Sequence, residues 1–236
     1  MRAGMAWVAW VAGIAGIAGG VRRSPGVVVG FICLFYTVGV VGMTISWSHD
    51  IFVALVPYTL ILSILLLFVF HPKLKSDEII LFSFLYFTSF AIEAVGTNTG
   101  EIFGQYYYGE TLGVKVADTP LMIGINWIMM IYMGWVITAK FIKNRWLQII
   151  PAALLLVGYD YILEPVAIAT DMWSWEEAVI PLQNYLAWFL YAALAFSLLA
   201  ALRIRFENKI APALFIAQSL FFIVLNFAGT SHGFAF

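Results

Sequence analysis

Charge is scarce in this chain: Asp, Glu, Lys and Arg make up 11% of its 236 residues, while 63% are hydrophobic. Soluble domains average about 25% charged residues, so the composition indicates a membrane protein. The formal net charge is −1, and long blocks of like charge are absent. Because nucleic-acid binding needs a concentrated basic surface, nucleic acid is excluded as a partner.

Residues for metal and cofactor chemistry are equally scarce. The single cysteine, Cys33, lies in an apolar run, which excludes a disulfide framework and a thiolate metal site. The three histidines, His49, His71 and His232, have no metal-ligand spacing. Neither a G-x-G-x-x-G nor a P-loop pattern is present, and no lysine lies within an apolar run to form a retinal Schiff base. What remains is a proton-transfer site without cofactor or metal.

Long apolar runs dominate the sequence. A helix that crosses a bilayer needs about 20 mostly apolar residues. Eight segments meet this criterion, at 5–21, 27–46, 51–70, 79–96, 119–139, 147–164, 183–202 and 210–229. We therefore expect an all-α fold, a polytopic transmembrane bundle of seven or eight helices. We expect residues 26–236 to form one integral-membrane domain, the catalytic one if the chain is an enzyme, and residues 1–25 to be an additional N-terminal hydrophobic segment, either a helix or a signal-like sequence.

The connectors between these segments differ in basic residues. The first, third, fifth and seventh connectors hold ten of the 12 Lys and Arg residues. Because basic connectors stay in the cytoplasm, the other connectors and both termini are expected on the outer side of a plasma membrane. Among the residues that lie in connectors, most of the acidic residues, glycines and aromatics are in the two long outer connectors, about 97–118 and 165–182.

A partial internal repeat relates the segments around these two connectors. "EAVGTNT" (93–99) matches "EPVAIAT" (164–170), and "PLMIGINW" (120–127) matches "PLQNYLAW" (181–188). Each unit runs helix, loop, helix, as in transporters built from parallel repeats. The repeat predicts that Glu93 and Glu164 occupy equivalent places, facing one another near the outer leaflet.

Three acidic residues lie within the predicted spans. An ionised carboxylate at the centre of a spanning helix costs about 2.5–3.5 kcal/mol, so Glu93, Asp160 and Glu164 are candidate catalytic residues. Asp160 is one turn deeper than Glu164 and on the same helix face, and two carboxyls that close are expected to share a proton. The alternative is structural, with the acids bonded to neighbouring helix ends or headgroups. Pro165, directly after Glu164, predicts that the helix ends there.

Polar and aromatic residues near these acids are candidates for binding substrate or water. Asn126, Gln183 and Asn184 fall in the first turns of the returning helices, where interhelical hydrogen bonds are the alternative role. Glu101 and Asp171 lie in the outer loops. The aromatic residues fit an interfacial belt, but their faces could also stabilise a carbocation. These candidates are Tyr106, Tyr108, Trp127, Trp173, Trp175 and Trp188.

The combined motifs resemble a known family. "EAVGTNTGEIFGQYYYGETLG", "TPLMIGINW", "DYILEPVA", "WSW" and "IPLQNYLAW" are similar to carotenoid biosynthesis membrane proteins that act as acyclic carotenoid 1,2-hydratases, of the bisanhydrobacterioruberin and gamma-carotene hydratase type. The likeness runs from about residue 27 to 229. The family commonly has Asp-Pro where this chain has Glu164–Pro165, a change that keeps the carboxyl and lengthens its reach.

The resemblance implies hydration of the terminal double bond of a lipophilic carotenoid within membrane lipid, with no cofactor. Asp160 would donate the proton, Glu164 would share it, and Glu93 would activate water. A carotenoid cyclase would begin with the same protonation and let an internal alkene capture the cation. A proton-coupled carrier is a further alternative, although the acids lie in the outer half, with no matching relay toward the cytoplasm.

Overall fold

A computed structural model describes Gly20 and residues 24–231 of the chain. The helices and strands, in chain order, are α2 (Pro25–Thr44), α3 (His49–Ala54), α4 (Val56–Phe70), α5 (Ser76–Thr99), β1 (Tyr106–Tyr108), β2 (Lys115–Val116), β3 (Thr119–Pro120), α6 (Met122–Phe141), α7 (Arg145–Ala169), β4 (Trp173–Trp175), α8 (Leu182–Ala201) and α9 (Ala211–Ser231). Six of these helices are long and apolar enough to cross a membrane, and α4 is a shorter apolar helix. The predicted all-α polytopic bundle is confirmed.

The predicted spans match the helices with one break. The run 51–70 is divided at Leu55 into α3 and α4. Pro57 lies in the first turn of α4, where its missing N–H leaves no helical bond unmade, so the proline favours a new helix start. The predicted span 5–21, and with it most of the N-terminal segment 1–25, lies outside the described residues.

The prediction that α7 ends before Pro165 is wrong, because α7 continues to Ala169. Proline is tolerated inside membrane helices where neighbouring groups satisfy the freed backbone. Pro165 has no N–H to bond the carbonyl of Tyr161, and the carbonyl of the next residue, Ile162, accepts a hydrogen bond from Asn226 Nδ2 of α9 at 2.9 Å. Glu164 therefore lies inside the helix and not at its end.

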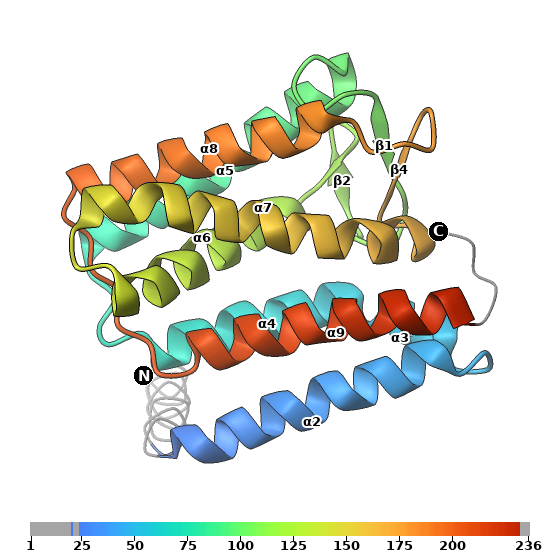
Figure 1. Cartoon of the computed structure of the whole chain (residues 1–236), viewed down its shortest axis with the longest axis horizontal. Helices are drawn as coiled ribbons and strands as arrows, with labels where there is room; N and C mark the ends of the chain where they lie inside the picture. Colours follow the sequence, from blue (N-terminus) through green and yellow to red (C-terminus); the bar gives the residue numbers. More distant parts are fainter. Residues whose placement is uncertain (1–19, 21–23, 232–236) are drawn as a thin grey trace, which may run out of the picture.

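The long helices lie side by side, and the strands gather at one end of the bundle (Figure 1). α6 is the central helix and packs against α4, α5, α7, α8 and α9. The outward faces of the other helices carry exposed Leu, Ile, Val and Phe side chains, as expected for surfaces in contact with lipid.

The two long connectors meet through β1 and β4. These strands pair antiparallel, with Tyr106 opposite Trp175 and Tyr108 opposite Trp173. Side chains alternate between the two faces of a strand, so all four of these aromatic rings point inward and are buried. The strand pair thus joins the unit α5–β1–α6 to the unit α7–β4–α8, which are the two halves of the sequence repeat.

Candidate active site

Three carboxyl groups meet inside the bundle beneath the β1–β4 pair. Glu93 of α5 is 3% exposed, Asp160 of α7 is 0% exposed and Glu164 of α7 is 1% exposed. They border a cavity of about 20 Å³, together with Phe103, Tyr106, Tyr108, Ile123, Trp173, Trp175, Asn184 and Trp188. A polar cavity of this size has room for about one water molecule.

Glu93 is held by three donors. The phenols of Tyr106 and Tyr108 donate to Glu93 Oε2 at 2.8 and 2.7 Å. The indole N–H of Trp127, from α6, donates to Oε1 at 2.8 Å. Since a carboxylate oxygen has two lone pairs, Oε2 is saturated and Oε1 can accept one further hydrogen bond.

Glu164 is held in the same way from the other half of the repeat. The indole N–H groups of Trp173 and Trp175 donate to its Oε2 at 2.9 and 3.0 Å. Its Oε1 accepts from Asn184 Nδ2 at 3.2 Å. Glu93 and Glu164 therefore each receive two donors from alternate residues of the strand in their own unit, as the equivalence in sequence predicts.

Asp160 is the least satisfied of the three acids. Its Oδ2 accepts from Asn184 Nδ2 at 2.9 Å, so one amide nitrogen of α8 bridges Asp160 and Glu164. Its Oδ1 is buried and has no hydrogen-bond partner among the described residues. A buried polar atom without a partner is costly, and such atoms often mark a place where water or substrate binds.

The carboxyl cluster has no cation beside it in the part of the chain that the structure describes. The ion pairs found there are His71 with Glu78 and Lys115 with Glu110, and neither includes a carboxyl of the cluster. Burying several negative charges together without compensation is strongly unfavourable, so the cluster is suited to holding protons.

The two tyrosines of β1 are fixed as hydrogen-bond donors. Burial raises the pKa of the Tyr106 phenol above its ordinary value of 10.0, and the neighbouring Glu93 carboxyl raises it further. The pKa of Tyr108 is raised well above 10.0 for the same two reasons. Both phenols therefore keep their protons at neutral pH. Four aromatic residues predicted for either an interfacial belt or the site, Tyr106, Tyr108, Trp173 and Trp175, all lie at the cluster.

Of the other predicted residues, Trp188 lies at the carboxyl cavity, and Gln183 and Asp171 are exposed in the outer part of the molecule. Trp188 lines the cavity and stacks on Trp127, with ring centroids 4.1 Å apart. Gln183 is exposed and donates to the Glu101 carbonyl at 2.6 Å, which ties the two outer loops together away from the carboxyls. Asp171 is also exposed and accepts from the Glu110 backbone N–H at 3.0 Å.

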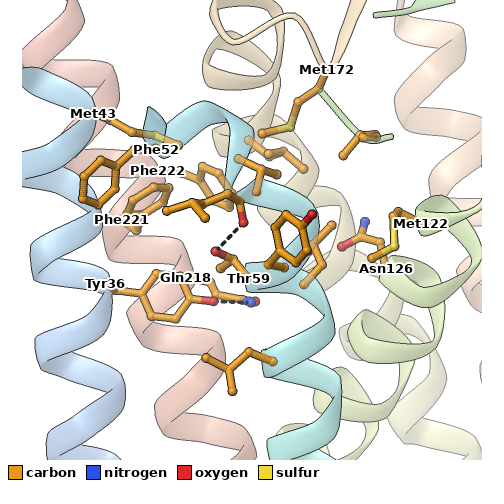
Figure 2. A pocket seen from close by; sticks show the side chains of 18 of the residues that line it. Tyr36, Met43, Phe52, Thr59, Met122, Asn126, Met172, Gln218, Phe221 and Phe222 are labelled. Atoms are coloured by element: carbon orange, nitrogen blue, oxygen red, sulfur yellow. Dashed lines mark hydrogen bonds between the residues drawn. The ribbon is translucent and has the colours of Figure 1, made fainter. Parts of the chain in front are cut away.

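Asn126 lies in a second, larger pocket of about 250 Å³. Figure 2 shows Asn126 and Met122 of α6 on one side of this pocket and Tyr36 of α2 and Gln218 of α9 on the other. Ile123 and Trp173 line both this pocket and the carboxyl cavity. Sequence reasoning missed this pocket and Ile123, because apolar residues in a membrane helix carry no pattern that distinguishes a pocket wall from a lipid-facing position.

Comparison with known proteins shows the family of the chain. The sequence model of a family described as "Carotenoid biosynthesis protein" matches residues 52–234. The chain belongs to this carotenoid biosynthesis family. The matched region includes all three carboxyls and every donor to them, and α2 precedes it.

A curated relative supports the membership of the carotenoid biosynthesis family and the predicted resemblance. The chain is 26% identical over 115 residues to the bisanhydrobacterioruberin hydratase of Haloarcula japonica, a stretch that covers 45% of this chain and 39% of the relative. The chain thus matches about two fifths of the relative's length. No solved structure matches the chain.

Proposed function

We propose that this protein is a carotenoid 1,2-hydratase, which adds water across the terminal double bond of an acyclic carotenoid end group. The observation that carries the proposal is the unpartnered Oδ1 of Asp160, on a fully buried acid beside a cavity with room for one water. Membership of the carotenoid biosynthesis family and the similarity to a protein named as a hydratase support the substrate class.

The proton for the reaction comes from the pair Asp160 and Glu164. Asn184 bridges the two carboxyls from one nitrogen, and no cation compensates them in the described part of the chain. In surroundings of low dielectric constant two adjacent carboxyls retain a proton between them. Because Glu164 Oε2 is saturated by two indoles, we assign the proton to the free oxygen of Asp160, which delivers it to carbon 2 of the alkene.

Protonation at carbon 2 leaves a tertiary cation at carbon 1. The rings of Tyr106, Tyr108, Trp173 and Trp175 line the cavity and supply aromatic faces that stabilise positive charge. A water molecule then forms a bond to carbon 1. Glu93 Oε1, which has one acceptor position left, holds this water, and the proton that the water releases restores the acid pair. The reaction is redox-neutral and consumes only water.

The site lies at the strand end of the bundle, whose connectors contain a single basic residue, Lys115, within residues 24–231. By the positive-inside rule we propose that this end faces the outer leaflet of the plasma membrane. A polyene about 30 Å long matches the bilayer core, so its end group reaches this depth while the remainder lies along the helices.

Expression of the chain in cells that accumulate lycopene or gamma-carotene tests the proposal. Mass analysis of the extracted pigments is expected to show a product heavier by one water, absent from cells that express Asp160→Asn. A product of unchanged mass would instead indicate a cyclase. Unaltered pigments, with the protein present in the membrane, would contradict the enzymatic function and favour a carrier.

A further inference from the structure

The pocket of about 250 Å³ is walled by α2, α3, α4, α6, α7 and α9 (Figure 2). Most of its lining is apolar, including Phe35, Phe52, Leu163, Phe221 and Phe222. Tyr36 and Gln218 also border it, but they are already paired, since Gln218 Nε2 donates to the Tyr36 hydroxyl at 2.8 Å. Such a surface suits a hydrocarbon ligand.

Asn126 is a polar residue in this mostly apolar lining. Asn126 is 8% exposed. Its side chain faces the pocket and makes no hydrogen bond to any described residue. Leaving an amide unpaired in an apolar interior costs about 1–3 kcal/mol. This placement indicates that the pocket is filled by a ligand or by water that reaches Asn126.

The pocket opens toward lipid on the side of α2 and α4. Three residues that line it are also exposed on the outer surface of the bundle: Val38 at 49%, Leu55 at 44% and Tyr58 at 67%. A ligand dissolved in the bilayer can therefore enter sideways between helices.

At its inner end the pocket adjoins the carboxyl cavity. Ile123 of α6 and Trp173 of β4 line both spaces, and the Trp173 indole donates to Glu164 Oε2 at 2.9 Å. Among the described residues only these two side chains line both spaces, so they form a partition between an apolar chamber and the acid.

The volume limits what the chamber can enclose. Sites that surround a drug-sized ligand measure about 300–1,000 Å³, so a chamber of about 250 Å³ holds only part of a long polyene. The remainder of such a molecule has to pass out through the lateral opening into lipid.

We propose that this chamber binds one terminal stretch of an isoprenoid polyene that enters from the bilayer, and that the terminal alkene meets Asp160 across the partition formed by Ile123 and Trp173. The proposal rests on the hydratase function above and adds the place where the substrate binds. It makes α4 and α2 part of the substrate site, although neither supplies a carboxyl.

Two matched tryptophan variants of α4 test the chamber. Leu62 lines the pocket, whereas Leu65, one turn along, is 55% exposed and does not. In an Asp160→Asn background, which prevents turnover, Leu62→Trp is expected to reduce lycopene bound per purified protein at least tenfold, measured by visible absorbance. Leu65→Trp is expected to bind lycopene as the parent does. Equal binding by both variants would overturn the proposal.

A second measurement uses substitutions that add no bulk. In a Cys33→Ser background, Leu62→Cys and Leu65→Cys are each labelled with an apolar maleimide in lipid nanodiscs. Saturating lycopene is expected to slow labelling at position 62 at least fivefold and to leave position 65 unchanged. Protection at neither position, or equally at both, would contradict the assignment and indicate bulk lipid or a different site.

These outcomes are distinguishable from failure of the proposed function. If lycopene binds and Leu62→Trp abolishes binding, but no hydrated pigment forms with the parent chain, the chamber stands and hydration is wrong. If the parent forms hydrated pigment while Leu62→Trp and Leu65→Trp make it equally fast, hydration stands and the chamber is wrong.

Discussion

The sharpest prediction compares Asp160→Asn with Glu164→Gln, two changes that remove one carboxyl each. Asn184 Nδ2 donates to Asp160 Oδ2, and Asp160 Oδ1 has no partner among the described residues. An asparagine at position 160 can place its oxygen on Asn184 and its NH₂ where Oδ1 lay. The substitution therefore breaks no hydrogen bond, and the fold is expected to be unaffected.

At position 164, by contrast, an amide cannot replace the carboxyl without breaking a hydrogen bond. Glu164 accepts at both oxygens, from two indoles at Oε2 and from Asn184 at Oε1. A glutamine there must turn its NH₂ toward one of these donors, so at least one buried bond is lost. The expected cost is about 1–3 kcal/mol. At roughly 2–4 °C per kcal/mol for a protein of this size, the unfolding temperature should fall by roughly 2–12 °C.

In the same experiment, the loss of activity is expected to be separable from the loss of stability. Loss of a general acid typically reduces a rate by about 10²–10⁴, which corresponds to roughly 3–5 kcal/mol in the barrier. Asp160→Asn should therefore lose hydration while it melts like the parent, and Glu164→Gln should lose both activity and stability. The measurements are product formation from lycopene and thermal unfolding of purified protein in one detergent. Hydration by Asp160→Asn within tenfold of the parent rate would refute the assignment of the acid.

Three further predictions concern the surroundings of the site. A methyl group at Gly96 would come within 2.5 Å of the Phe103 ring that lines the cavity, so Gly96→Ala should reduce the rate of hydration. A methyl group at Gly158 would have no neighbour within 4 Å, so Gly158→Ala should leave the rate unchanged. Equal rates for the two variants would contradict this packing. The two buried phenols of β1 have pKa values raised by burial, so their contribution to stability is complete below about pH 10, the value in an unfolded chain, and is lost as the pH rises further. Melting temperature should accordingly be insensitive to these phenols from pH 7 to 9 and fall above about pH 10. A melting temperature of the parent chain that does not fall above about pH 10 would argue against burial of the two phenols. Tyr132, which contacts His71 and Asn208 at 2.9 and 3.2 Å, lies outside the site, so Tyr132→Phe should lower stability by about 1–3 kcal/mol without changing the pigment products.

The sequence was sufficient to predict most of the described helices and the meeting of the carboxyls. Spanning helices follow from apolar length alone, and the spacing of Asp160 and Glu164 together with the repeat placed Glu93 opposite them. This worked because a buried acid in a membrane helix is rare enough to stand out.

Other features depended on tertiary contacts. α7 continues past Pro165, and in the turn before this proline the carbonyl of Ile162 accepts a hydrogen bond from Asn226 of α9, a residue 64 positions further along the chain. The pairing of β1 with β4 involves three residues in each strand, too few to give a periodic pattern. The sequence alone therefore favoured an interfacial belt for aromatic residues such as Tyr106 and Trp173 and left the site as the alternative.

The proposed roles of the three acids were also assigned from geometry. All three side chains are buried carboxyls, and they differ in how many hydrogen-bond donors each receives. Glu93 and Glu164 each accept three hydrogen bonds, while Asp160 accepts one. Only coordinates distinguish an acid held in place from one with an oxygen free to react.

The central claim is that a buried carboxylic acid protonates a carotenoid alkene and that water captures the cation. The most direct measurement is the reaction of purified protein with lycopene in oxygen-labelled water and, separately, in heavy water. The mechanism predicts one labelled oxygen in the tertiary alcohol and one deuterium bound to the adjacent carbon. A product whose oxygen does not come from water, or whose carbon skeleton carries no deuterium, would contradict it.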